Sequence, residues 1–144
     1  MSINNPLNPL KKASETSSGE VYSTEEIRIG TWIDGKPLYR KTYMLSSPSS
    51  SQTNSTNNKS IYDATTQGID TMVSIGGVIK GYHQNSPDTP AQYNAPVVFG
   101  NDRFCPFFSG GGVSIYINGS YMYSKPMIIV LEYTKTTDEP ETTT

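Results

Sequence analysis

The side chains that most often carry out catalysis are scarce in this sequence. The chain has one histidine, His83, and one cysteine, Cys105. A nucleophile paired with a general base, or a zinc site of Cys and His ligands, needs more of these residues than the chain supplies. His83 stands in the polar segment GYHQNSPDTP, which favours a solvated loop residue. Cys105 stands in the apolar run RFCPFF, which favours a buried, unreactive thiol.

The acidic residues and the glycine-rich segment offer little more. The aspartates at 63, 70, 88 and 102 are scattered along the chain, without the spacing of a calcium loop, namely Asp63, Asp70, Asp88 and Asp102. SGGGVS at 109–114 lacks the lysine and the following helix of a phosphate loop. The sequence therefore predicts a protein that is not an enzyme and that holds neither a metal nor a cofactor. Two carboxylates that met across a sheet would instead indicate a hydrolase of surface glycans.

Tyrosine is the one reactive residue type present in unusual number, with ten copies. An exposed tyrosine offers a large contact area with a polar tip, so it can stack on a sugar ring or join two subunits. A tyrosine inside a thin domain packs against the core instead. All three uses remain open from the sequence.

Length and charge exclude several classes of protein. With 144 residues the chain has room for one domain. The net charge is −2 and no run of Lys or Arg exceeds two residues, so nucleic acid is not an expected partner. The N-terminal residues lack the apolar stretch of a secretory leader. No apolar run approaches the roughly 18 residues of a membrane span, so no membrane association is expected.

Composition divides the chain into an arm, a domain and a tail. Residues 1–21 are mostly polar or Pro and are predicted to form a short extended arm. Residues 22–138 hold the apolar runs and are predicted to form the domain, with a polar loop at 46–60. Residues 139–144 are predicted to be a polar tail.

The apolar runs of the domain are short, often alternate with polar residues, and end at Gly, Asn, Asp or Ser, which is typical of β-strands. Two hairpins are predicted, with Asp-Gly and Asn-Gly as two-residue turns at 34–35 and 118–119. The second would place Tyr116 opposite Tyr121. MIIVLEYT at 127–134 favours a central strand buried on both faces. We therefore predict an all-β domain, an antiparallel β-sandwich or jelly-roll-like fold of about six to eight strands without a helix.

Two segments of the domain resemble a known module. The string YSTEEIRIGTWIDGKPLYRKTY at 22–43, together with IVLEYTKTTD at 129–138, is similar to a module that recurs in phage and prophage structural proteins of Firmicutes and gut bacteria. That module usually stands at the C-terminal end of tail-fibre, receptor-binding or head-fibre proteins. Residues 46–126 match it only loosely. Longer members carry a shaft or a large domain upstream, whereas 21 residues precede the module here.

The resemblance implies a non-enzymatic structural protein on the surface of a phage particle, made in the cytoplasm of the bacterial host. Because the sequence has no shaft, it fits a head fibre, a decoration protein or the tip of a tail fibre, and would contribute to host attachment. The expected partners are other copies of the chain in a trimer, a capsid or tail protein, and a glycan on the host surface. A stand-alone carbohydrate-binding module is the alternative.

Three groups of residues are predicted to make the contacts of such a protein. Docking on the virion is assigned to apolar residues of the arm, namely Ile3, Pro6, Leu7, Pro9 and Leu10. Contact between subunits is assigned to aromatic residues of the two hairpins, namely Trp32, Tyr39, Tyr43, Tyr116, Tyr121 and Tyr123. Receptor binding is assigned to two predicted loops, 81–95 and 101–112, with Tyr82, His83, Tyr93, Asn101 and Arg103.

Overall fold

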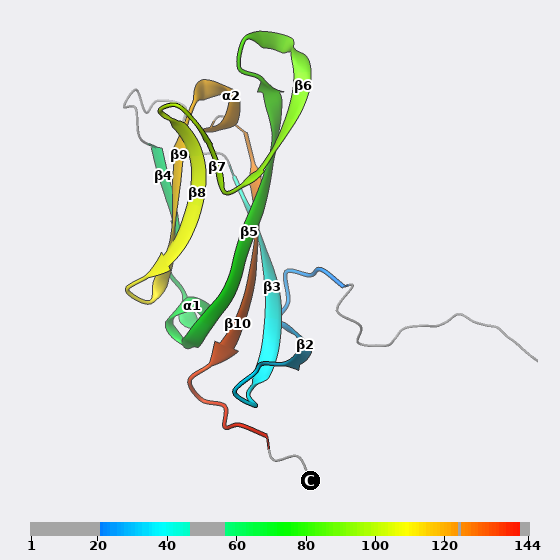
Figure 1. Ribbon diagram of the computed structural model, residues 1–144, viewed down its shortest axis with the longest axis vertical. Helices are drawn as coiled ribbons and strands as arrows, with labels where there is room; N and C mark the ends of the chain where they lie inside the picture. Colours follow the sequence, from blue (N-terminus) through cyan, green and yellow to red (C-terminus); the bar gives the residue numbers. More distant parts are fainter. Residues whose placement is uncertain (1–20, 47–56, 124, 142–144) are drawn as a thin grey trace, which may run out of the picture.

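The computed structural model describes residues 21–46, 57–123 and 125–141 and shows an all-β protein (Figure 1). The described part of the chain has nine strands and two helices of four residues each. In chain order they are β2 (Ile27–Thr31), β3 (Pro37–Leu45), β4 (Asn57–Ile61), α1 (Ala64–Gln67), β5 (Ile69–His83), β6 (Ser86–Ala95), β7 (Val97–Phe99), β8 (Asp102–Ser109), β9 (Gly112–Asn118), α2 (Ser120–Tyr123) and β10 (Met127–Lys135).

The strands form two antiparallel sheets. A five-stranded sheet has the order β2-β3-β10-β5-β6, and a four-stranded sheet has the order β4-β9-β8-β7. We call them the large sheet and the small sheet. In Figure 1 the small sheet stands to the left of β5, and the β2–β3 hairpin extends below it. The all-β antiparallel class is therefore confirmed, while a sandwich or jelly-roll connectivity stays a prediction.

One hydrophobic core joins the two sheets. Alternate residues of β9, Val113, Ile115 and Ile117, are fully buried, as expected for a strand with one face turned inward. From the large sheet, Ile129 and Leu131 of β10 join the same cluster. β10 lies in the middle of its sheet as predicted. Its two faces differ, however, because Ile128, Val130 and Glu132 are more exposed than the residues between them, so burial on both faces was wrong.

The predicted hairpin at Asn118-Gly119 does not form. β9 ends at Asn118, α2 follows, and β10 pairs with β3 and β5 in the other sheet. The reason is burial, because Tyr121 is 4% exposed and Met122 is 0% exposed in the core instead of continuing a strand beside β9. Tyr116 is paired with Cys105 of β8, not with Tyr121.

The first hairpin forms with a longer turn than the sequence predicts. The backbone N–H of Trp32 donates to the carbonyl of Lys36 at 2.8 Å, which leaves a three-residue loop, 33–35. Gly35 adopts a φ of 91°, the left-handed conformation that closes such loops. Thr31 then pairs with Pro37, whereas a two-residue turn at 34–35 would pair it with Leu38. Ile33 sits at the loop tip and is 91% exposed.

Three segments predicted as loops contain strands. Residues 81–95 form most of the β5–β6 hairpin, and 101–112 contain β8. β6 tolerates two prolines because it lies at the edge of the large sheet, where half of its N–H groups need no strand partner. Of the predicted polar loop 46–60, residues 57–60 belong to β4, and 47–56 lie outside the described residues. The polar composition of the three segments predicts loops, but backbone hydrogen bonds to a neighbouring strand make their residues in β4, β6 and β8 extended.

Gly76 and Gly77 lie inside β5, where they pair with Val130 and Ile129 of β10. A Cβ atom added to Gly77 would lie 2.8 Å from Cδ1 of Ile129 and 3.0 Å from Cζ of Phe104. We expect Gly77→Ala to lower the free energy of unfolding by about 1–3 kcal/mol through overpacking.

Gly76→Ala is the matched control for Gly77→Ala, because a Cβ atom at Gly76 meets nothing within 4 Å. Urea denaturation followed by tyrosine and tryptophan fluorescence measures both variants. Equal midpoints for the two variants would contradict the close approach of the sheets at Gly77.

Candidate functional site

The strands of the segments 22–43 and 129–138 lie side by side. β3 and β10 pair along their length, from Met127 opposite Leu45 to Tyr133 opposite Tyr39. Nη2 of Arg40 donates to Oε2 of Glu132 at 2.6 Å, an ion pair between residues 92 positions apart. The rings of Tyr39 and Tyr133 stack with centroids 6.1 Å apart. β2, β3 and β10 therefore form one structural unit, which we call the module unit.

The start of the predicted polar tail belongs to this unit. The backbone N–H of Glu141 donates to the carbonyl of Gly35 at 2.7 Å. Nη1 of Arg28 donates to Oε2 of Glu141 at 2.8 Å, and this hydrogen bond lowers the pKa of the carboxyl group. The tail is thus held against the β2–β3 hairpin through residue 141, and 142–144 lie outside the described residues.

The predicted subunit-contact residues do not share one surface. Tyr39 and Tyr43 pack against the core, and the hydroxyl of Tyr43 donates to Asp63 at 2.9 Å. Burial, with this hydrogen bond second, raises the pKa of Tyr43 well above its ordinary value. Tyr121 is 4% exposed and donates to Asp102 at 2.7 Å, so it is not available to a second subunit. Trp32 is half-buried beside the hairpin loop.

For two sets of the predicted contact residues, the side chains lie outside the described residues. Tyr123 lies in α2, and its side chain is outside the described residues. The docking residues of the arm, Ile3, Pro6, Leu7, Pro9 and Leu10, also lie outside them.

The outer face of the small sheet presents aromatic and polar side chains. Strand alternation sends Phe104 and Ile117 into the core, so their neighbours Arg103 and Tyr116 point outward. The ring of Tyr116 lies edge to face with Phe107, at 5.1 Å between centroids. The guanidinium of Arg103 lies 5.1 Å from the centre of the same ring.

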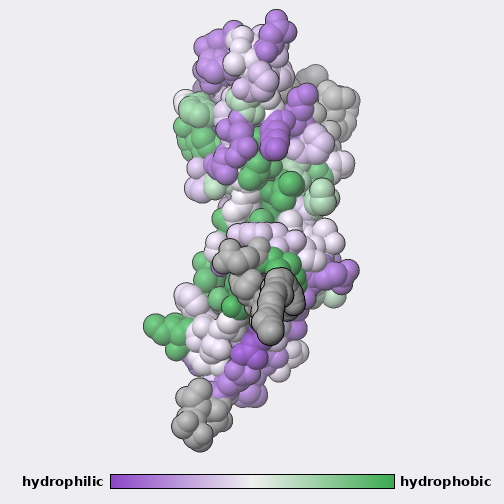
Figure 2. Space-filling model, turned by 90° about the vertical axis from the view of Figure 1, so that its right-hand side faces the viewer, coloured by the Kyte–Doolittle hydropathy of each residue, from purple (hydrophilic) through white to green (hydrophobic). Residues whose placement is uncertain are grey.

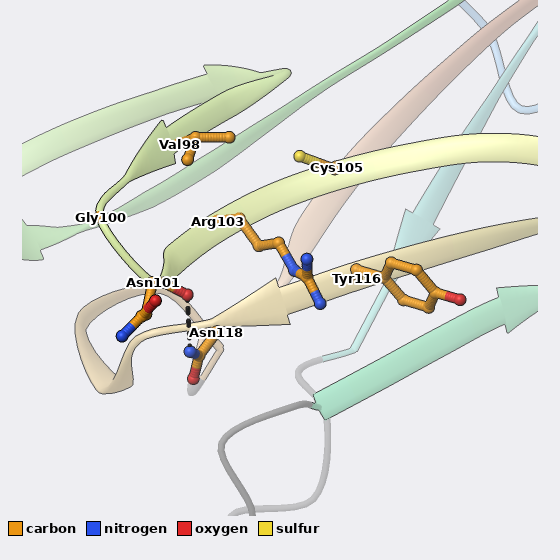
Figure 3. Close-up of a pocket in the computed structure, with 7 residues that line it drawn as sticks. All are labelled: Val98, Gly100, Asn101, Arg103, Cys105, Tyr116 and Asn118. Carbon is orange, nitrogen blue, oxygen red and sulfur yellow. Dashed lines mark hydrogen bonds between the residues drawn. The ribbon is translucent and has the colours of Figure 1, made fainter.

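A pocket of about 440 Å³ opens on this face (Figure 3). Two rows of paired residues build it. In one row Val98 of β7, Arg103 of β8 and Asn118 of β9 are direct cross-strand neighbours. In the next row Cys105 faces Tyr116. The pocket is lined by these residues and by the β7–β8 turn, namely Val98, Gly100, Asn101, Arg103, Cys105, Tyr116 and Asn118.

The polar atoms of the pocket are arranged as donors and acceptors. Nδ2 of Asn118 donates to the backbone carbonyl of Asn101 at 2.8 Å, which holds the turn against β9. Arg103 reaches across toward Asn118 and Tyr116 (Figure 3). Its Nε atom is buried without a hydrogen-bond partner among the described residues. None of the ion pairs between described residues includes Arg103. The pocket thus holds a cation whose charge is not balanced by the described carboxylates.

Only part of the predicted receptor site reaches this pocket. Asn101 and Arg103 line it, whereas Tyr93 is 8% exposed and its hydroxyl donates to the carbonyl of Tyr82. His83 is exposed at the β5–β6 turn and accepts a hydrogen bond from the N–H of Asn85. Two of the five predicted receptor residues therefore line the pocket.

Residues that the predictions missed complete the pocket. Asn118 was assigned to a turn, Val98 received no role, and Cys105 was expected to be buried and inert. Tyr116 was assigned to subunit contact. Alternation within 102–109 and 112–118 carried the missing signal, because it places Arg103, Cys105, Tyr116 and Asn118 on one face once β8 and β9 are paired.

The outer face of the large sheet differs in character. A groove of about 260 Å³ there is almost wholly apolar, and among the described residues Lys80 is the only charged one that lines it. Met44, Val78 and Ile128 form a cross-strand row within it, with Met44 70% exposed. Figure 2 looks onto this side and shows hydrophobic residues gathered near the middle of the molecule. The pocket on the small sheet, with its polar side chains, is therefore the better candidate for binding a polar ligand.

The described residues hold neither a membrane-spanning helix nor a metal-ligand cluster. None of the helices in that part of the chain has the length and apolar character required to cross a bilayer. Within the same residues, no cluster of three or more His, Cys, Asp or Glu side chains is placed to hold a metal ion.

Comparison with known proteins gave no match: no family model, no curated protein and no solved structure matches this chain. The class that the structure defines is an antiparallel all-β domain with an aromatic and polar pocket on an outer sheet face.

Proposed function

We propose that the chain is a non-enzymatic structural protein of a bacteriophage particle, a head fibre or decoration protein or the tip of a tail fibre, which contributes to host attachment. The observation that carries the proposal is the module unit. Residues 22–43 and 129–138 resemble the phage module as separate strings, and they fold into three adjacent strands tied by the Arg40–Glu132 ion pair. Segments that belong to one module are expected to meet in this way.

The second sheet supports the attachment part of the proposal. Its outer face supplies a ring surface, two amides and a guanidinium in one open pocket. These groups bind polar ligands and do not require a nucleophile or a metal. The proposed partners are other copies of the chain in a trimer, a capsid or tail protein, and a host surface glycan. The proposed location is the surface of the virion, after synthesis in the host cytoplasm.

The direct test is the protein content of particles. Phage released from a bacterium that carries this gene are purified by density gradient, and the chain is sought by mass spectrometry and by antibody labelling in the electron microscope. Labelling at the head or at the tail tip supports the proposal and separates its two forms. A chain that is abundant in the lysate but absent from purified particles would overturn it.

A stand-alone carbohydrate-binding module is the second candidate, and the pocket of the small sheet favours it. Sedimentation equilibrium of the purified chain separates the two proposals. A trimer supports the virion protein, whereas a stable monomer that binds sugars and is missing from particles supports the free module.

Deletion of residues 1–20 is expected to leave the domain folded but to abolish its incorporation into particles. The reason is that the apolar residues of the arm are proposed to bind the capsid or tail protein. A double variant, Leu7→Asn with Leu10→Asn, keeps the length of the arm and tests the same contact. Incorporation is measured by the amount of the chain per particle, and normal amounts for both variants would refute the docking role.

A further inference from the structure

We propose that the pocket between β7, β8 and β9 binds an anionic sugar unit, with its carboxylate or phosphate on Arg103 and its ring against Tyr116. This inference deepens the attachment function proposed above and depends on that function for its biological role. The binding chemistry itself is a property of the pocket and can be measured on the purified chain.

The charge of the ligand follows from Arg103. The guanidinium lies in the pocket, its Nε has no hydrogen-bond partner among the described residues, and the ion pairs of those residues do not include it. A partly buried cation without a counter-charge favours an anion from solution. The planar fork of an arginine matches carboxylate and phosphate oxygens in a bidentate way. The ligand is therefore expected to carry one of these groups.

The hydroxyl groups of the ligand follow from the two asparagines. Nδ2 of Asn118 uses one hydrogen to hold the carbonyl of Asn101 and keeps a second N–H. Its Oδ1 is an acceptor without a hydrogen-bond partner among the described residues. The Asn101 side chain lies at the rim of the pocket, on the turn that this hydrogen bond holds (Figure 3). Amides that both donate and accept suit sugar hydroxyls, which do the same. A bare inorganic anion would leave the acceptors unused.

The ring of the ligand follows from the apolar wall. Tyr116 presents its ring to the pocket, and Phe107 packs edge to face against it and limits its rotation. Val98, 61% exposed, adds methyl groups on the opposite side of Arg103. An oriented ring with an apolar neighbour suits the C–H face of a pyranose. The volume of about 440 Å³ lies within the usual range for small ligands, roughly 300–1,000 Å³.

The test uses the side-chain N–H signals of arginine in the full-length ¹⁵N-labelled protein. The chain has three arginines, Arg28, Arg40 and Arg103, so the Nε–H region of the spectrum is sparse. Arg103→Lys assigns the signal of Arg103 by its loss. D-glucuronate, D-glucose 6-phosphate and D-glucose are then titrated separately at one ionic strength and pH, with sodium acetate and inorganic phosphate as the bare anions.

We expect the Arg103 signal to shift and saturate with glucuronate, with glucose 6-phosphate or with both, and the difference between them identifies the preferred anion. Glucose and the bare anions should bind at least about tenfold more weakly, the factor that corresponds to losing one charge-assisted contact. The signals of Arg28 and Arg40 should not move. Backbone signals of Tyr116 and Asn118 should shift together with that of Arg103.

Two variants make the result specific. Arg103→Lys keeps the charge but loses the fork, and it should weaken binding of the preferred sugar about tenfold, as followed through Tyr116 and Asn118. Arg28→Lys is the matched control, because Arg28 is also on a sheet surface but pairs with Glu141 far from the pocket. It should leave binding unchanged, and an intact spectrum shows that each variant is folded.

The outcomes separate this inference from the attachment proposal. No saturable shift with either acidic sugar, or an equal shift with glucose or a bare anion, would overturn the anionic-sugar site even if the chain is found in particles. Saturable binding that Arg103→Lys weakens would support the site even if the chain is absent from particles, in which case only the virion proposal fails.

Discussion

Phe104→Ala is expected to lower the free energy of unfolding by about 3–5 kcal/mol, the largest effect of any substitution considered for this protein. Phe104 is 0% exposed and projects from the small sheet toward the large one. Its Cζ lies 3.0 Å from where a Cβ atom of Gly77 would stand, so the ring fills the space between the sheets. Removing it leaves a cavity that the two sheets cannot close without moving relative to each other.

Phe107→Ala is the control for Phe104→Ala on the same strand. Phe107 is 38% exposed on the opposite face of β8, so the substitution should cost about 1 kcal/mol or less. It should instead weaken sugar binding, because Phe107 supports the ring of Tyr116. Urea denaturation of both variants measures the difference. A larger loss for Phe107→Ala than for Phe104→Ala would show that the inner and outer faces of the small sheet are assigned the wrong way round.

Glu132→Gln is expected to lower the free energy of unfolding by about 2–3 kcal/mol, because it leaves the Arg40 guanidinium, 10% exposed, opposite an uncharged amide. The expected value lies toward the low end for breaking a buried pair, since the side chain of Glu132 keeps 23% of its surface exposed. The substitution preserves shape, so the loss reports the charge alone. It tests the ion pair that joins β3 to β10.

Glu141→Gln is the matched control for Glu132→Gln. It breaks another Arg–Glu pair of the module unit, but both of its side chains are 44% exposed, so water replaces the contact and the unfolding midpoint should barely change. Raising the salt concentration should reduce whatever effect remains. Equal losses for the two variants would mean that the Arg40–Glu132 pair does not hold β3 to β10 in the way the structure indicates.

The strands themselves were predictable because their signal is local. Alternation and turn residues predicted strands on both sides of Asp34-Gly35, a strand before Asn118 and a strand at 127–134, and the structure has β2, β3, β9 and β10 there. The central position of β10 followed from its apolar run. Edge strands β4 and β6 escaped prediction because their polar and proline-rich residues have no apolar face to read. Their conformation comes from hydrogen bonds to β9 and β5, partners that no local window contains.

The pairing of strands was less predictable because it depends on competition over long distances. Asn118-Gly119 has the chemistry of a hairpin turn, a preference of about 1 kcal/mol. Burying Tyr121 and Met122 in the core is worth several times that, at roughly 1.5–3 kcal/mol for each large apolar side chain. The chain therefore leaves the small sheet at α2 and enters the large one.

The residues of the candidate pocket were likewise only partly predictable from the sequence. Asn101 and Arg103 were found from the sequence as polar residues in a supposed loop, for a reason that the structure does not support, since Arg103 lies in β8. Asn118 and Cys105 could be added only after β8 was paired with β9 and the register placed them opposite Arg103 and Tyr116. A shift of one residue would have turned all four into the core.

By itself the sequence determined the all-β class and the scarcity of groups for nucleophilic or metal chemistry. These depend on composition and on short-range periodicity, which exist before the chain folds. The tertiary structure alone decided that β2 and β3 adjoin β10, that Tyr39, Tyr43 and Tyr121 face inward, and that a cation lies in a pocket beside Tyr116. Such facts depend on which distant strands pair, and the burial of the whole core selects that pairing.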